Sequence, residues 1–216
     1  MRVSIEKRKA AKPSAHLKAF ADRRRDPDTK REAVLHTALQ IFMERGYWQT
    51  SLNDIADKLK ITKPAIYHYF HNKEEIYLEC YRRGIARVEE DLEQIRQHRG
   101  TGLEKVGEFI QKYASQITRD FGRFLVRQDD RDLSGTAKAE VRRCKRSIDH
   151  HLREFIQQGV DDASIRPCNV KLAAFSVAGA VNSLVVWFLP NGDLTAEQVA
   201  AELAQTLTQG LVRKDR

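Results

Sequence analysis

Basic, aromatic and small apolar side chains are crowded into one short segment of this sequence, residues 62–73. Lysine can donate to the acceptors of guanine in the DNA major groove, and proline or alanine can contact a thymine methyl group. Tyrosine, histidine, serine and threonine can donate to phosphate oxygens. The candidate DNA contacts are Thr50, Ser51, Thr62, Lys63, Pro64, Ala65, Tyr67, His68, Tyr69 and Lys73.

These candidates have different expected roles. Lys63, Pro64 and Ala65 open a short helix and can face base edges, whereas the following aromatic residues can reach phosphate. Lys73 lies at the positive end of another helix, where amide donors and an ammonium group together bind an anion. Tyr69 has a second interpretation, packing into a small core, which is the role assigned to Ile66 and Phe70.

Two short helices joined by a tight turn must position this segment. Thr50 or Ser51 can cap the first helix, residues 60–61 make the turn, and Thr62 can cap the second. This is the build of a helix-turn-helix, whose second helix lies in the DNA major groove.

Longer helices are expected on both sides. Asp26 can cap a preceding helix that ends at Gly46. Asn72 and Glu75 form an expected capping box for a following helix that runs to about residue 99. That helix is long enough to link one domain to the next.

The rest of the chain also shows helical periodicity, with no alternating pattern of a half-buried strand. Thr195 and Gln198 form an expected capping box at the last helix. The further helices are expected near residues 103–118, 120–128, 136–160, 169–189 and 195–210. The expected fold is therefore all-α, with about nine helices.

Composition narrows the class of protein. Hydrophobic residues make up 41% of 216, which is enough for a packed core. No uninterrupted apolar run reaches the length of a membrane span, so none is expected. Three distant cysteines, Cys80, Cys144 and Cys168, suggest unpaired thiols in a reducing cytosol, and hence a cytoplasmic protein.

The net charge of +8 is concentrated at the N-terminus. Residues 1–25 contain nine basic residues against Glu6 and Asp22, whereas residues 26–84 contain nine basic and nine acidic residues. Such an arm suits a polyanion, because each phosphate contact releases counterions. A solvated leader that only aids solubility is the alternative, and the sequence does not distinguish the two.

Several linked motifs resemble the N-terminal domain of the tetracycline-repressor (TetR) family of bacterial transcription regulators. The matching segments are residues 38–42, 46–47, 50–56, 62–67 and 69–76. The resemblance implies an arm at residues 1–25, a three-helix DNA-binding domain at 26–72, and a linker helix with a C-terminal effector-binding and dimerisation domain at 73–216. It also implies a ligand-responsive repressor that binds a palindromic operator as a homodimer.

The resemblance places an effector pocket and a dimer surface in the C-terminal domain. The candidate pocket residues are Phe109, Tyr113, Phe121, Phe124 and Trp187, and the candidate dimer residues are Gly179, Ala180, Ser183, Leu203, Leu207 and Leu211. Arg119, Arg123 and Arg127 share one helical flank that could meet an anionic effector, or could simply be solvated. Asn182 could contact a ligand or bond across the dimer, but pairing with backbone is the expected role. The effector remains unknown.

Other functions are weaker on this sequence. An architectural or partner-regulated DNA-binding dimer without a metabolite effector is the main alternative. No Gly-rich phosphate loop or convincing nucleophile with a base appears, so an enzyme is not expected, and no cofactor is implied. The Asp149-His150-His151 cluster is a poor metal site, because adjacent histidines point to different helix flanks.

Overall fold

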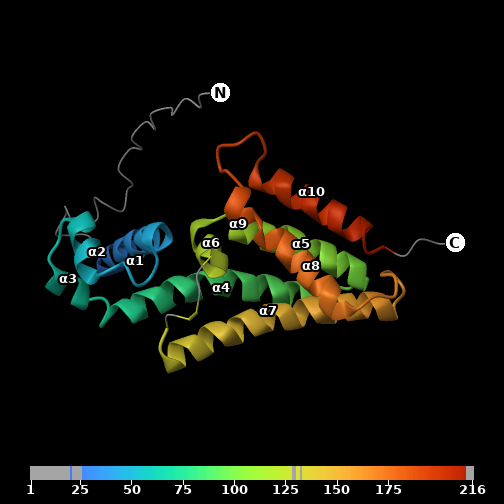
Figure 1. Ribbon diagram of the computed structural model, residues 1–216, viewed down its shortest axis with the longest axis horizontal. Coiled ribbons are helices and arrows are strands. Elements are labelled where there is room, and N and C mark those ends of the chain that lie inside the picture. Colours follow the sequence, from blue (N-terminus) through green and yellow to red (C-terminus); the bar gives the residue numbers. More distant parts are fainter. Residues whose placement is uncertain (1–19, 21–25, 128–129, 132, 213–216) are drawn as a thin grey trace.

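The computed structural model describes residue 20 and residues 26–127, 130–131 and 133–212, and the regular elements within these ranges are all α-helices (Figure 1). An isolated antiparallel bridge joins Ile165 to Val212. The helices are α1 (Pro27–Arg45), α2 (Leu52–Leu59), α3 (Lys63–Tyr67), α4 (Lys73–Gln97), α5 (Gly102–Ile117), α6 (Asp120–Arg127), α7 (Gly135–Asp161), α8 (Val170–Asn182), α9 (Leu184–Trp187) and α10 (Ala196–Gln209). The expected all-α fold is confirmed.

Helices α1 to α3 pack around one small core at the end of the molecule opposite α10 (Figure 1). Phe42 of α1, Ile55 of α2 and Ile66 of α3 are each 0% exposed. Phe70, just after α3, is 1% exposed. The core assignment of Ile66 and Phe70 is confirmed, and it fixes which face of α3 remains free.

The turn between α2 and α3 has the expected geometry. The Ser51 hydroxyl accepts from the Asp54 amide, and the Asp54 carboxylate accepts from the Ser51 amide at 2.7 Å, which completes a capping box. Lys60 ends α2 in the left-handed conformation at φ 57°. Gly46 has φ 84° after α1, a region that glycine enters without steric cost.

Three expected caps differ from the structure. Asp26 and Thr62 make no side-chain cap hydrogen bond. At Thr62 the reason is local, because Pro64 has no amide donor and the Ala65 amide already donates to the Thr62 carbonyl. Asn72 does cap α4, but the Glu75 carboxylate accepts from the His71 amide, so the expected box does not form.

Helix α4 connects the domain formed by α1 to α3 with the C-terminal domain (Figure 1). Its 25 residues span about 37 Å at the usual rise per residue. Toward α1, the Arg83 guanidinium makes two bonds to the Glu32 carboxylate at 2.6 and 2.7 Å, and Arg31 reaches Glu79 at 3.3 Å. These ion pairs therefore hold α4 to α1 of the N-terminal domain.

Helix α7 runs parallel to α4 along its other side (Figure 1). Near their N-termini, the Glu74 carboxylate accepts from the amide and the hydroxyl of Ser134 at 2.9 and 2.8 Å. Two turns further on, Arg82 forms a two-bond pair with Glu140 at 2.7 and 2.9 Å. Helix α7 of the C-terminal domain is thus bonded to the N-terminal part of α4, the part that is closest to helices α1 to α3.

Helix α6 is wedged between the two domains. Its Phe124 packs edge-on against Tyr77 of α4 and lies 6.1 Å from the Phe42 ring of α1. Gly84 allows α4 to approach it closely, since a Cβ at this position would lie 2.5 Å from the Phe121 carbonyl oxygen. The Phe121 backbone therefore approaches α4 at Gly84 without a side chain of α4 between them.

The expected helix over residues 169–189 is broken in two, which gives ten helices in the described residues instead of about nine. The break falls at Ser183, whose hydroxyl donates to the Ala180 carbonyl at 2.7 Å and accepts from the Trp187 indole at 3.0 Å. A serine that bonds its own helix backbone competes with the regular ladder.

The stretch Val170–Trp187, where the sequence predicts no membrane span, is long and apolar enough to cross a membrane by length and composition. Core helices of globular domains meet the same criterion, and α8 packs on α5 and α7 of the C-terminal domain.

Candidate nucleic-acid interface

The free face of α3 carries the predicted base-reading residues. Lys63 and Pro64 are exposed, Ala65 is half-buried, and Tyr67 is 47% exposed. Since Ile66 fills the core beneath them, these side chains point away from the domain. The Lys63 ammonium lies 6.0 Å from the centre of the Tyr67 ring. The face offers a cation, an aromatic hydroxyl and small apolar groups at once, as base-edge and phosphate contacts require.

The residues before α2 are less available than their types suggested. Thr50 is 2% exposed, and its hydroxyl donates to the Gly46 carbonyl at 2.7 Å. This corrects the expectation of a phosphate contact from its side chain. Ser51 is exposed, but its hydroxyl is held by Asp54. These hydrogen bonds from Ser51 hold the pKa of the Asp54 carboxyl below its usual value.

Lys73 closes the loop between α1 and α2. Its ammonium donates to the carbonyls of Tyr47 and Thr50 at 2.7 and 2.8 Å and lies 4.0 Å from the Tyr47 ring centre. Burial lowers the pKa of this ammonium. Two of its three protons are committed to the fold, so one remains for the predicted phosphate. Trp48, beside this loop, is 69% exposed.

The two remaining aromatic candidates differ. His68 and Thr62 are exposed beside α3. Tyr69 is half-buried and packs edge-on against Phe20, with 6.2 Å between the ring centres. Phe20 also contacts the hydrophobic core of the domain. The sequence indicated an inward role for Tyr69 as one alternative but did not single out Phe20, a lone aromatic residue within a basic arm.

The candidate pocket residues do not gather in one place. Phe109 and Tyr113 stack on each other at 5.3 Å between ring centres. Phe124 lies in the domain junction described above, and Phe121 packs edge-on against His36 of α1. Trp187 is 49% exposed on α9. The structure therefore brings only Phe109 and Tyr113 together. The other three candidates are separated by packing between helices that lie far apart in the sequence.

Polar groups inside the C-terminal domain surround this aromatic pair. The Tyr113 hydroxyl donates to the Asn182 side-chain oxygen at 3.0 Å, which corrects the expectation that Asn182 pairs with backbone. The Tyr81 hydroxyl of α4 is buried without a hydrogen-bond partner among the described residues. Burial raises the pKa of both tyrosines. A buried hydroxyl without a partner costs free energy and needs an explanation.

The three arginines of the α6 region also separate. Arg119 and Arg127 are exposed, which fits a solvated face. Arg123 is half-buried, and one guanidinium nitrogen donates to the Val185 carbonyl at 3.3 Å. Its Nε is buried and has no partner in the described part of the chain.

The candidate dimer residues lie at the surface formed by α8 and α10. Gly179 is exposed, Leu207 is half-buried and Leu211 is buried. Ala180, Ser183 and Leu203 are half-buried. The structure adds large exposed apolar residues on the same stretch, which the sequence analysis did not name: Leu172 at 62%, Phe175 at 52% and Val186 at 84% exposure.

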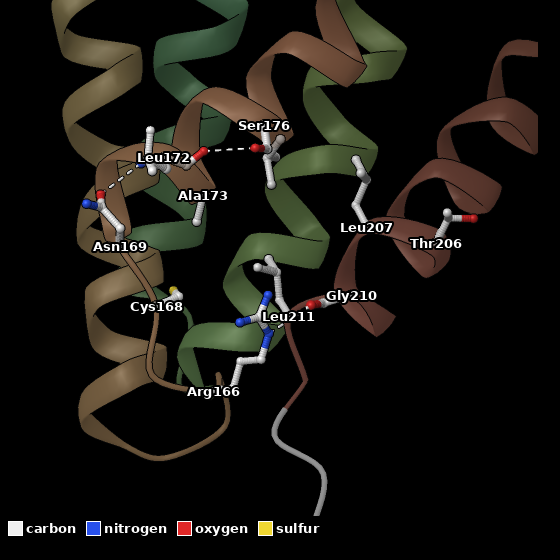
Figure 2. A pocket seen from close by; sticks show the side chains of 11 residues that line it. Arg166, Cys168, Asn169, Leu172, Ala173, Ser176, Thr206, Leu207, Gly210 and Leu211 are labelled. Carbon is white, nitrogen blue, oxygen red and sulfur yellow. Dashed lines mark hydrogen bonds between the residues drawn. The ribbon is translucent and has the colours of Figure 1, made fainter.

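A groove of about 440 Å³ separates the start of α8 from the end of α10. Figure 2 shows Leu172 and Ser176 on one wall and Leu207 on the facing helix. Arg166 lies at the mouth, and its guanidinium donates to the Gly210 carbonyl at 3.2 Å. The apolar surface thus continues from α8 to α10.

The histidine cluster on α7 is divided between different neighbours. His150 lies 3.3 Å from the Glu154 carboxylate, and the His151 ring lies 2.8 Å from the Ser147 carbonyl. Within the described residues, no group of three metal-ligating side chains comes together.

Two protein-family models match this chain. The model described as bacterial regulatory proteins, tetR family, matches residues 34–80, and the tetracyclin repressor-like C-terminal domain matches residues 99–211. The HTH-type transcriptional repressor KstR2 of Mycolicibacterium smegmatis is 26% identical over 190 residues, which covers 87% of this chain and 93% of the relative.

Solved structures show the same architecture. The ketosteroid transcriptional regulator KstR2 of Mycobacterium tuberculosis superposes with a TM-score of 0.81 at 22% identity, over 88% of this chain and 98% of that one. AibR in complex with isovaleryl coenzyme A and operator DNA gives a TM-score of 0.73 at 26% identity, over 85% and 98% of the two chains. The similarity extends through both domains.

Proposed function

Because this chain belongs to the TetR family of bacterial regulatory proteins, we propose that it is a repressor that binds a palindromic operator as a homodimer and is released by an acyl-coenzyme A. The observation that carries the proposal is the free face of α3. Lys63 and Tyr67 are exposed while Ile66 is fully buried, so the helix presents polar groups outward from a rigid domain. Such a regulator acts where bacterial DNA lies, in the cytoplasm.

Dimerisation is supported by the exposed apolar face of α8. Leu172, Phe175 and Gly179 recur at intervals of three and four residues, which places them along one side of α8, and Val186 lies beyond the break on α9. An exposed apolar stripe of this kind marks an interaction surface. A second copy that places its α8 and α10 against these helices covers the stripe in a four-helix contact. Two reading heads then meet two half-sites.

Two features support an acyl-coenzyme A as the effector. AibR, similar in fold and sequence, was solved with isovaleryl coenzyme A and operator DNA. The Tyr81 hydroxyl on α4 and the Arg123 Nε on α6 are buried donors that have no partner among the described residues. An acyl-coenzyme A carries both a carbonyl that accepts hydrogen bonds and phosphates that attract cations.

The route from effector to DNA runs along α4. Glu74 and Arg82 of α4 are bonded to α7, and Arg83 is bonded to α1. A ligand that favours one arrangement of the C-terminal helices changes the direction of α4 and the spacing of the two α3 helices. Release follows only if the ligand binds the two arrangements with different affinity.

The experiment maps bound genomic sites and then titrates a recovered site with purified protein. We expect a palindromic site, two subunits per site, and release by isovaleryl coenzyme A but not by free coenzyme A or isovalerate. Dispersed binding that no acyl-coenzyme A reverses would favour the architectural alternative. A tight complex with one subunit would refute the dimer.

A further inference from the structure

We propose that Trp48, in the loop between α1 and α2, is a further DNA-contact residue that donates its indole N–H to a phosphate oxygen beside Lys73. This inference rests on the proposed binding of operator DNA and adds to it a contact that carries no charge. Phosphate contacts position a protein on the duplex without reading its sequence. Trp48 therefore strengthens binding to every operator sequence alike.

Trp48 presents an aromatic ring to solvent in a domain that buries most of its hydrophobic residues. It is 69% exposed, and Tyr67 on the free face of α3 is the other large exposed hydrophobic residue among the described residues of α1 to α3 and their loops. The Trp48 indole N–H has no hydrogen-bond partner in the described part of the chain, whereas the Trp187 indole donates to Ser183. An apolar ring with an available donor suits an interface that is partly apolar and partly wet.

The loop that carries Trp48 is held in place by several hydrogen bonds. The Thr50 amide donates to the Tyr47 carbonyl at 3.3 Å, and the Thr50 hydroxyl donates to the Gly46 carbonyl at 2.7 Å. The Lys73 ammonium donates to the Tyr47 and Thr50 carbonyls. The Tyr47 ring packs on the domain core and meets the Trp48 ring edge-on, with 5.8 Å between their centres. The loop is therefore formed before binding, and little ordering of the chain opposes the contact.

The Lys73 ammonium places this indole beside a position suited to an anion. The ammonium lies 4.0 Å from the Tyr47 ring centre and 5.8 Å from the Trp48 ring centre. Two of its protons are bonded to carbonyls, and the third can meet a phosphate oxygen. An indole N–H is a donor without an acceptor, so it also selects an oxygen that accepts. A polyanion satisfies both groups, whereas an apolar or basic partner would bury or repel the ammonium.

The position of the loop also favours DNA as the partner. Figure 1 shows α2, α3 and the start of α4 at the same end of the molecule. Ser51, an exposed residue that caps α2, follows Trp48 by three positions. Lys73 opens α4 six residues after α3 ends at Tyr67. Because Lys73 is bonded to the loop, Trp48 lies at the edge of the surface that carries the proposed DNA contacts.

The first test uses the full-length protein, one mapped operator and the fluorescence of Trp48. The sequence contains two tryptophans, so Trp187→Phe leaves Trp48 as the single indole reporter. The operator affinity of this variant is measured first and serves as the reference. Saturating operator should then reduce the quenching of Trp48 by acrylamide, a neutral quencher, because the DNA backbone covers the ring.

Two substitutions in the same background separate the N–H from the ring. Trp48→Phe keeps a ring but removes the donor, and it should weaken operator binding by about tenfold or more, as for a lost hydrogen bond to a charged group. Trp48→Ala should weaken binding further, and both losses should be equal across operators with single base changes. Leu194→Ala removes an exposed apolar residue between α9 and α10 and should keep the reference affinity.

The salt dependence separates a direct contact from a supporting role in the loop. A neutral donor displaces no counterion, so both Trp48 variants should keep the slope of log K against log salt. If Trp48 only holds the loop in place, its loss also releases Lys73 from its phosphate and lowers the slope by about 0.9. An affinity loss accompanied by that change in slope would overturn the direct contact.

Two further outcomes distinguish this inference from the proposed function. An operator affinity of Trp48→Phe equal to the reference would overturn the N–H contact, and unchanged acrylamide quenching would assign the exposed ring to another partner. Absence of any bound genomic site for the wild-type protein would instead refute the proposed function, before the Trp48 variants are compared.

Discussion

The DNA-binding domain and the C-terminal domain expose opposite kinds of surface. The free face of α3 presents Lys63 and Tyr67 above a filled core, whereas Leu172 and Phe175 of α8 and Val186 of α9 are exposed. Polar donors suit base edges and phosphates, which stay hydrated until contact. Large apolar side chains suit a permanent partner that removes them from water. The contrast fits the proposed roles, which are DNA contact at one end of the molecule and self-association at the other.

The largest effect is expected where this contrast is broken on α8. Phe175→Asp places a carboxylate in the proposed dimer surface, and loss of a central apolar anchor costs about 2–4 kcal/mol of association. Sedimentation should show monomers, and affinity for a palindromic site should fall at least about 30-fold. Ala139→Asp, at an exposed position on α7 outside the proposed dimer surface, is the control. A Phe175→Asp dimer of unchanged strength would assign the exposed stripe to another partner.

The next effect concerns base reading on α3. Lys63→Ala should cost about 1–3 kcal/mol and relax the sequence preference at one position of each half-site. Binding to a panel of operators with single base changes measures both quantities. Lys138→Ala on α7 serves as the matched loss of a lysine in the other domain. A uniform loss across the panel would reassign Lys63 to a phosphate contact.

A smaller effect separates two buried tyrosines of the C-terminal domain. Tyr113→Phe removes the bond to Asn182 and should lower the free energy of unfolding by about 0.5–1.5 kcal/mol. Tyr81→Phe removes a hydroxyl that has no partner in the described part of the structure and should leave stability equal or slightly higher.

Operator affinity without effector should stay unchanged in both tyrosine variants, because neither hydroxyl lies in the DNA-binding domain. If Tyr81 contacts the effector, its variant should need a higher concentration of isovaleryl coenzyme A for release. Stability lost by Tyr81→Phe as strongly as by Tyr113→Phe would show that the Tyr81 hydroxyl has a partner after all.

The smallest effect is a pH dependence that both domains share. Capping boxes hold Asp54 at α2 and Glu104 at α5, and hydrogen bonds from Ser51 and Thr101 lower the pKa of each carboxyl. A carboxyl whose pKa is lower in the folded state stabilises the fold above its unfolded pKa, near 4. That contribution is lost as pH falls through the folded value.

The melting temperature of both domains should therefore fall as the pH is lowered from about 6 to 2.5. Asp54→Asn should flatten this dependence in signals from the DNA-binding domain and Glu104→Gln in those from the C-terminal domain. If neither substitution changes the loss of thermal stability at low pH, other carboxyl groups are responsible for it.

The sequence predicted the DNA-binding domain well because its logic is local. The spacing of Ile66 and Phe70 places them in the core, and that leaves the outward face of α3 determined by one helix. The failures there are also local: Thr50 turned its hydroxyl to the Gly46 carbonyl, and Glu75 reached His71. Residue types alone do not choose between two acceptors or donors one position apart.

The C-terminal domain was less predictable because its packing is long-range. Phe124 meets residues of α1 and α4, which lie far away in sequence, and so it belongs to the domain junction. The partner of Asn182 lies on α5, about seventy residues earlier. Exposure of Phe175 could not be read from a helix that is apolar on several faces. Helical periodicity predicted where the helices lie in the sequence but not which helices pack against one another.

Because Gly84 has no side chain, α4 lies directly against the Phe121 backbone of α6, and this contact can serve as a pivot for α4. The Phe121 carbonyl presses against the helix there, eleven residues from Lys73 and thirteen from Gln97. At about 1.5 Å per residue these lever arms measure roughly 16.5 and 19.5 Å. A displacement of the far end about this point reappears at the DNA end in the opposite direction, reduced by only about a sixth. The strut can therefore act as a nearly balanced lever, with the position of α6 setting its pivot.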